Sequence, residues 1–116
     1  MKLRLQGNSL RLRLTRTEVE RLRDTGLVEE SVDFGAGAAL TYRISAASVP
    51  SLHAGFSGRA ITVQVPSESA RQWAEADEVG LYAAQGALRI SVEKDFRCLT
   101  RRPEEQEPDA YAHPGE

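Results

Sequence analysis

The feature that most constrains this 116-residue chain is an alternating strand pattern that precedes a helix and occurs twice. Residues 10–14 alternate leucine with arginine, which is the period of two expected of a strand with one buried face and one exposed face. Residues 61–65 repeat the alternation 51 positions later, and the pattern of residues 40–44 reappears 48 positions later at 88–92. We therefore predict an internal repeat of two strand, helix, strand, strand units.

The first unit, residues 1–45, carries the signals of a helix between strands. Thr15 and Glu18 form a capping-box pattern, in which each side chain satisfies a free backbone N–H, and Gly26 is placed to end the helix. The helix is therefore predicted over residues 16–25. The strand candidates around it are residues 2–5, 10–14, 27–34 and 40–45.

The second unit, residues 59–95, follows a connector at 46–58 that shows little periodicity. Its helix is predicted to begin at Pro66-Ser67 and to bury Trp73. Its strand candidates are residues 61–65, 79–83 and 88–92. Because neither unit has enough apolar residues for a core of its own, the two should pack as one domain over residues 1–99. The expected fold is α+β, mainly β, as a small barrel or sandwich from two pseudo-symmetric units, with barrel closure removing exposed strand edges.

Composition predicts a small cytoplasmic protein. Hydrophobic residues make up 41% of the chain and charged residues 28%, which is ordinary for a globular domain. The single cysteine excludes an internal disulfide, and no signal peptide or apolar run of about 20 residues is present. We expect a monomer or homodimer that does not enter a membrane.

Positive charge gathers near the start of the chain, although the net charge is -2. On alternating strands these side chains should share one exposed face, where they could neutralise phosphates of DNA. The alternative is a charged face that only keeps the protein soluble; no aromatic residue is interleaved with these positions to stack on bases. The predicted nucleic-acid-binding residues are Lys2, Arg4, Arg11, Arg13 and Arg16.

Residues 100–116 form an acidic tail that contains three prolines. A tail of this composition lacks the apolar residues needed for a core. A solubilising tail is the simplest interpretation; an intramolecular strap along the basic strands and an acidic ligand for a basic protein partner are the alternatives. The predicted partner-binding residues are Glu104, Glu105, Glu107, Asp109 and Tyr111.

Cys98 is a weak candidate for chemistry, with His113 and His53 as possible companions. Thiolate and imidazole bind zinc or form a nucleophile pair, but the spacings match no known metal or protease pattern. A lone cysteine between Phe96 and Leu99 is more typical of a small buried residue. No cofactor is therefore expected, and a metal- or thiol-dependent enzyme is the least favoured function.

Two resemblances add to this interpretation. The segment Gly7–Leu14 followed by a short helix, and Ile61–Pro66 followed by a helix and Ala76–Val79, each resemble the AbrB and MazE type of DNA-binding domain. Those domains are swapped-hairpin barrels made by two identical chains, so the resemblance implies that one chain here supplies both halves. It also implies a non-enzymatic DNA-binding or antitoxin-like module; a protein-interaction domain without nucleic-acid binding is the alternative.

The whole chain also resembles an uncharacterised bacterial family of similar length. The resemblance is carried by Gln6–Ser9, Arg13–Thr15 and Glu93–Leu99. It implies no particular activity.

Overall fold

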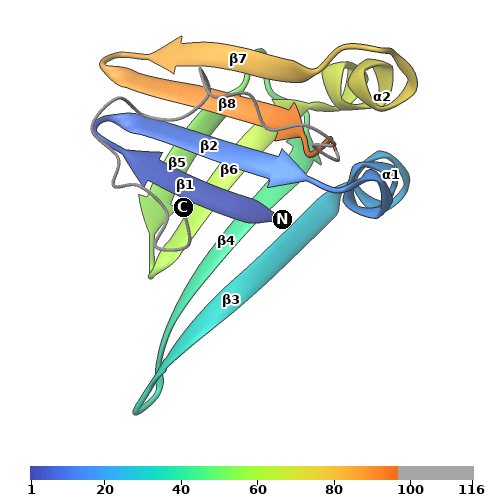
Figure 1. The fold of residues 1–116 in the computed structure, drawn as a ribbon. Helices are drawn as coiled ribbons and strands as arrows, with labels where there is room; N and C mark the ends of the chain where they lie inside the picture. Colours follow the sequence, from blue (N-terminus) through green and yellow to red (C-terminus); the bar gives the residue numbers. More distant parts are fainter. Residues whose placement is uncertain (97–116) are drawn as a thin grey trace, which may run out of the picture.

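The structure is a computed structural model that describes residues 1–96 (Figure 1). The predicted acidic tail, together with Cys98 and His113, lies outside the described residues. Within residues 1–96 the fold is α+β and mainly β, with eight strands and two helices. Their order is β1 (Lys2–Gln6), β2 (Ser9–Leu14), α1 (Arg16–Thr25), β3 (Leu27–Gly35), β4 (Ala38–Ala47), β5 (His53–Ser57), β6 (Ala60–Pro66), α2 (Ser67–Glu75), β7 (Gly80–Gln85) and β8 (Leu88–Lys94).

The strands form two four-stranded sheets that cross one another (Figure 1). Sheet A has the strand order β1-β2-β8-β7, and sheet B has the order β3-β4-β6-β5. Strand β2 runs parallel to β8, and β4 runs parallel to β6, whereas the other neighbours are antiparallel. Each sheet therefore combines one hairpin from the first half of the chain with one hairpin from the second half.

The core lies between the sheets and beneath the helices. In β2 the leucines face inward and the arginines face outward, as the alternation predicts. Burying each such leucine contributes about 1.5–3 kcal/mol. No polar or charged residue within 1–96 is buried. The buried side chains are Leu10, Leu12, Leu14, Val19, Leu22, Val28, Ile44, Ala54, Ile61, Val63, Val65, Ala70, Trp73, Ile90 and Val92.

The expected closure into a barrel is wrong, because side chains bridge the seams between the two sheets in place of a backbone ladder. At one seam the Gln85 amide of β7 donates to the carbonyl of Ala54 in β5 and accepts from its N–H, both at 2.8 Å. At the other seam the amino group of Met1, just before β1, pairs with Glu30 of β3 at 2.5 Å. The two sheets are thus linked at their edges but remain separate.

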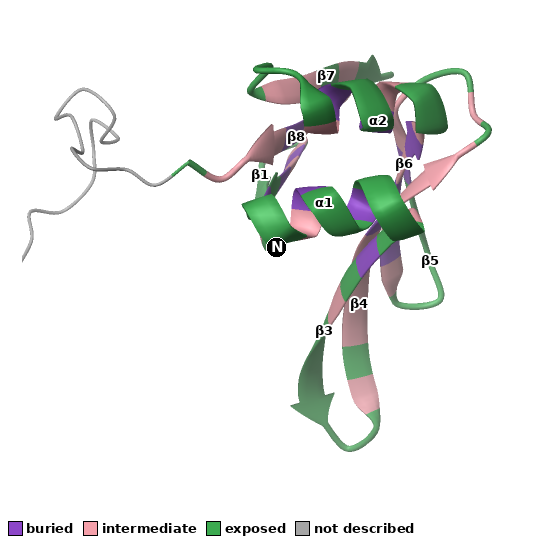
Figure 2. Cartoon of the chain, turned by 90° about the vertical axis from the view of Figure 1, so that its right-hand side faces the viewer, coloured by how far each residue is buried: buried purple, intermediate pink, exposed green. Residues whose placement is uncertain are grey.

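Both helices lie side by side at one end of the sheets (Figures 1 and 2). Helix α1 begins after Thr15 with the predicted capping box and ends at Gly26, whose φ of 81° is left-handed. Helix α2 follows Pro66, as predicted, and buries Trp73. Neither helix is long and apolar enough to span a membrane.

Two strand regions differ from the sequence prediction. Residues 53–57, within the predicted connector, form β5, an edge strand in which only Ala54 is buried. Strands β3 and β4 are longer than predicted and extend beyond β6 as a two-stranded arm (Figure 2). The arm carries the exposed side chains Val32 and Phe34.

Candidate nucleic-acid interface

The antiparallel β1–β2 hairpin brings four of the five predicted basic residues together. In its register Lys2 lies opposite Arg13, and Arg4 lies opposite Arg11. Side chains at such positions share one face of a sheet, here the face of sheet A that points away from the core. With Leu3 they line a groove of about 290 Å³. The fifth predicted residue, Arg16, begins α1 and does not line this groove.

Strand β8 adds a carboxylate to this face. Glu93 is the register partner of Arg13, and its Oε1 lies 3.4 Å from Nε of Arg11 and 3.7 Å from Nε of Arg13. Beyond the end of β8, Asp95 pairs with Lys2 at 3.1 Å. The two carboxylates therefore hold three of the basic side chains and offset part of their charge.

Strand β7 adds an aromatic side chain that sequence analysis did not place near the basic residues. Ser91 of β8 is the register partner of both Arg11 and Tyr82, so the tyrosine lies two strands from Arg11 on the same face. The Tyr82 side chain is exposed, and its hydroxyl donates a hydrogen bond of 2.8 Å to Oε2 of Glu93. This bond, reinforced by partial burial, raises the pKa of Tyr82 above its ordinary value of 10.0.

Gly80 makes room for the tyrosine. A Cβ at Gly80 would lie 2.7 Å from the carbonyl oxygen of Val92, 2.8 Å from the Tyr82 hydroxyl and 2.9 Å from Cγ of Glu93. Such distances are too short for any side chain. The Tyr82 ring therefore extends across Gly80 toward Glu93, over space that only glycine leaves open.

Arg89 is a further basic residue of this face that sequence analysis missed. It is exposed on β8, two positions before Ser91, and is the register partner of Ser9. Arg89 lies beside the other basic residues only because β2 pairs in parallel with β8, which joins segments about 80 residues apart. The alternation within β8 shows that Arg89 is exposed, but the pairing decides which residues lie beside it.

The corresponding face of sheet B has a different character. There Thr62 and Gln64 of β6, which lie on the same face as Arg43, are uncharged. Arg43 is bound on that face by Glu29 at 2.9 Å and by the Thr62 hydroxyl at 3.1 Å. The concentration of arginine is therefore specific to sheet A.

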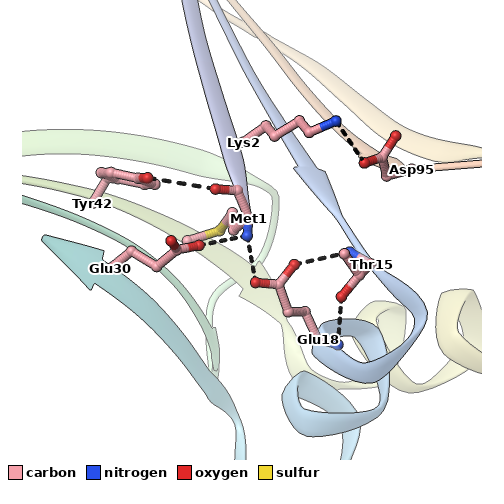
Figure 3. A network of polar contacts seen from close by, with 7 residues as sticks. All are labelled: Met1, Lys2, Thr15, Glu18, Glu30, Tyr42 and Asp95. Carbon is pink, nitrogen blue, oxygen red and sulfur yellow. Dashed lines mark hydrogen bonds and ion pairs between the residues drawn. The ribbon is translucent and has the colours of Figure 1, made fainter.

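A network at the chain start anchors β1, which carries Lys2 and Arg4 (Figure 3). The Met1 ammonium pairs with Glu18 and Glu30, and the Tyr42 hydroxyl donates to the Met1 carbonyl at 3.4 Å. Burial by itself lowers the pKa of the ammonium, but its hydrogen bonds to the two carboxylates outweigh burial and raise that pKa.

Glu18 connects this network to the capping box of α1. It accepts from the Thr15 N–H at 2.9 Å, and its own N–H donates to the Thr15 hydroxyl at 3.3 Å. Burial by itself raises the pKa of Glu18, but hydrogen bonds from the Met1 ammonium and from the Thr15 N–H lower it below its ordinary value. One carboxylate thus stabilises both the helix start and the first strand.

A second, apolar groove of about 330 Å³ opens between the sheets at the end away from the helices. Two of its side chains, Leu5 and Phe56, are largely exposed. Its lining comes from strands of both sheets: Leu5, Leu10, Ala54, Gly55, Phe56, Ile61 and Leu88. No titratable side chain lines it, and it is separate from the basic groove.

Of the other sequence candidates, only His53 lies within the described residues. Among residues 1–96, no group of three histidine, cysteine, aspartate or glutamate side chains is arranged to hold a metal ion. His53 lies in β5, where Nδ1 is 3.3 Å from the carbonyl oxygen of Ser51. Cys98, His113 and the tail residues Glu104, Glu105, Glu107, Asp109 and Tyr111 lie outside the described part of the chain.

Comparison with known proteins gives a family but no activity. No curated protein and no solved structure matches the chain. A family model described as a family of unknown function, DUF7009, matches residues 1–115. Since the match covers nearly the whole chain, this protein belongs to the DUF7009 family.

Proposed function

We propose that this protein is a non-enzymatic module that binds nucleic acid through the outer face of sheet A. The observation that carries the proposal is the β1–β2 register, which sets Arg4 opposite Arg11 and Lys2 opposite Arg13 on an exposed face. Guanidinium groups bind phosphate through two parallel hydrogen bonds, so neighbouring arginines suit a phosphate backbone. Arg89 extends the basic surface across β8.

The carboxylates on this face are compatible with phosphate binding. Glu93 contacts Arg11 and Arg13 through one oxygen at 3.4 and 3.7 Å, which are long distances for charge-assisted bonds. Ion pairs of exposed side chains typically contribute about 0–1 kcal/mol, so a phosphate can compete with them. Glu93 also limits where the two guanidinium groups lie, which reduces the entropy lost on binding.

The test is fluorescence anisotropy with labelled oligonucleotides over a series of salt concentrations. If four side chains each neutralise one phosphate, the slope of log K against log salt should be about -3 for single strands. The double variant Arg11→Glu/Arg13→Glu should weaken binding about tenfold or more. The matched control is Arg21→Glu/Arg71→Glu, with one substitution on each helix. It changes the net charge by the same amount as the first variant and should bind nucleic acid much more tightly than that variant. Absence of binding at low salt would contradict the proposal.

We also propose that the two halves are structural repeats, which would make the binding face one-sided. Both halves have the order strand, strand, helix, strand, strand. The parallel pairings are related by the same shifts of 51 and 48 positions found in the sequence, as in Leu10↔Ile90 and Leu12↔Val92 of sheet A against Ile61↔Tyr42 and Val63↔Ile44 of sheet B. Since the first copy has arginine where the second has threonine and glutamine, only sheet A should bind a polyanion.

The AbrB and MazE resemblance is supported by the hairpin exchange, in which each sheet takes one hairpin from each half. An antitoxin-like role through the acidic tail, and the alternative of a protein-interaction domain, stay predictions that depend on residues outside 1–96. Deleting residues 103–116 and measuring partner capture with the purified domain would test both.

A further inference from the structure

We infer that the sheet A face selects single-stranded over duplex nucleic acid, with Tyr82 as the stacking surface for one base. The inference rests on the proposed function and names its substrate class. An exposed aromatic ring next to basic side chains on an open sheet face is the arrangement by which single strands are bound, with bases stacking and phosphates paired. In a duplex the base faces are covered by their neighbours, so a ring lying on a sheet cannot reach them.

The first supporting observation is the exposure of the ring. Tyr82 is 60% exposed although it lies in the middle of β7. Its neighbours on the same face of β7 are Gly80 and Ala84, and its register partner is Ser91. These small side chains leave the space around the ring open to a base.

The second observation is that the ring is held in place. Its hydroxyl donates to Glu93 at 2.8 Å, and the ring crosses the bare backbone of Gly80. A ring fixed in advance loses little conformational entropy when a base stacks on it. The same carboxylate contacts Arg11 and Arg13, so the ring and the two guanidinium groups are positioned by one residue.

The third observation is the spacing of the strands that carry the ring and the arginines. Tyr82 and Arg11 lie on β7 and β2, which are separated only by β8. Adjacent strands are about 4.8 Å apart, so the two backbones are about 10 Å apart. A base on the ring therefore leaves flanking phosphates within reach of the long arginine side chains.

The experiment compares a labelled single strand of about 12 nucleotides, within the site sizes typical of small β domains, with the duplex of the same sequence. The wild-type chain should bind the single strand more tightly. Because stacking on an aromatic side chain contributes about 1–3 kcal/mol per base, Tyr82→Ala should weaken single-strand binding about 5- to 150-fold. Duplex binding should change by less than about twofold, since phosphate contacts remain.

Two control variants make the result specific. Phe34→Ala removes another exposed aromatic side chain, from the β3–β4 arm, and should leave both affinities unchanged. Tyr82→Phe keeps the ring and removes the hydrogen bond to Glu93, so it should retain most of the single-strand affinity. Thermal unfolding of each variant checks that the fold is retained.

The outcomes separate this inference from the proposed function. Loss of single-strand affinity in Tyr82→Ala supports the inference when duplex affinity is retained and both Phe34→Ala and Tyr82→Phe bind the single strand nearly as tightly as the wild type. If duplex binds as tightly as single strand and Tyr82→Ala changes neither, while Arg11→Glu/Arg13→Glu weakens both, the inference is overturned and the proposed function stands. If neither nucleic acid binds the wild-type chain, both are overturned.

Discussion

Tyr82 and Glu93 are joined by a hydrogen bond of 2.8 Å across β7 and β8, although the register partner of Glu93 is Gly80. The tyrosine reaches the carboxylate diagonally, over a position that has no side chain. Gly80 precedes the tyrosine by two residues on the same strand, so the ring lies along its own strand above the bare glycine backbone. Here the arrangement also connects an exposed ring to the arginines of β2, which is the relationship on which the binding proposal depends.

Gly80→Ala should destabilise the protein. The new Cβ would lie 2.7 Å from the Val92 carbonyl oxygen and would displace the Tyr82 hydroxyl, and overpacking of this kind costs about 1–3 kcal/mol. Urea unfolding measures the loss. The matched control is Gly55→Ala in β5, where a Cβ meets nothing within 4 Å, and this variant should be neutral or slightly more stable. Equal stability of the two variants would contradict the geometry.

Glu93→Gln should strengthen nucleic-acid binding. The amide can still accept from Tyr82, but it no longer offsets the charge of Arg11 and Arg13. Since exposed ion pairs contribute up to about 1 kcal/mol, the affinity should rise by up to about fivefold, with a steeper salt dependence. Glu29→Gln, which removes the carboxylate paired with Arg43 on sheet B, is the control and should change affinity less. Weaker binding by Glu93→Gln would argue against phosphate as the ligand.

Thr15→Ala should lower the free energy of unfolding by about 1 kcal/mol, because it removes the side chain that caps α1. The measurement is urea or thermal unfolding followed by circular dichroism. Thr17→Ala, two residues later and exposed in the first turn of α1, should have little effect. Because alanine favours a helix more than threonine does, a similar loss for both variants would contradict a specific role for the Thr15 cap.

The ion pair between Met1 and Glu18 should make the free energy of unfolding depend on pH in both the alkaline and the acidic range. The pKa of the ammonium is raised from 8.0, so its contribution is complete below pH 8 and is lost as pH rises through the raised value. The pKa of Glu18 is lowered from 4.5, so its contribution is complete above that pH and is lost as pH falls through the lowered value. Unfolding free energies measured across this range should therefore decline at both ends.

Glu18→Gln should flatten both declines, because the ammonium loses one partner and the titrating carboxylate is gone. Glu68→Gln, which removes an exposed carboxylate paired with Arg71 on α2, provides the control and should leave the pH profile close to that of the wild type. A profile unchanged by Glu18→Gln would show that the network does not control the pH dependence.

Local sequence signals predicted the helices and most strands. Thr15, Glu18 and Gly26 define α1 because capping depends only on residues within a few positions of each other. Strand β5 was missed because it is an edge strand in which only Ala54 is buried. Its sequence therefore shows no clear alternation of apolar and polar residues. Closure into a barrel was predicted wrongly because a pattern of strands does not show that Gln85 and Met1 would bridge the seams with polar groups.

The candidate interface was predictable only in part. The clustering of Lys2, Arg4, Arg11 and Arg13 follows from one hairpin, whose register is fixed by a short turn. Tyr82 and Arg89 join it through the parallel pairing of β2 with β8, a contact between distant segments that hydrophobic patterning does not specify. Sequence reasoning therefore found the basic side chains of the proposed interface but not the aromatic ring beside them.

The most direct test of the central claim is an NMR titration of the ¹⁵N-labelled chain with a short single-stranded oligonucleotide at low salt. The account predicts that amide shifts change along β1, β2, β8 and β7, with the largest changes around Arg11, Ser91 and Tyr82, and that the outer face of sheet B around Thr62 is unaffected. Shift changes concentrated on sheet B, or no changes at saturating oligonucleotide, would contradict it.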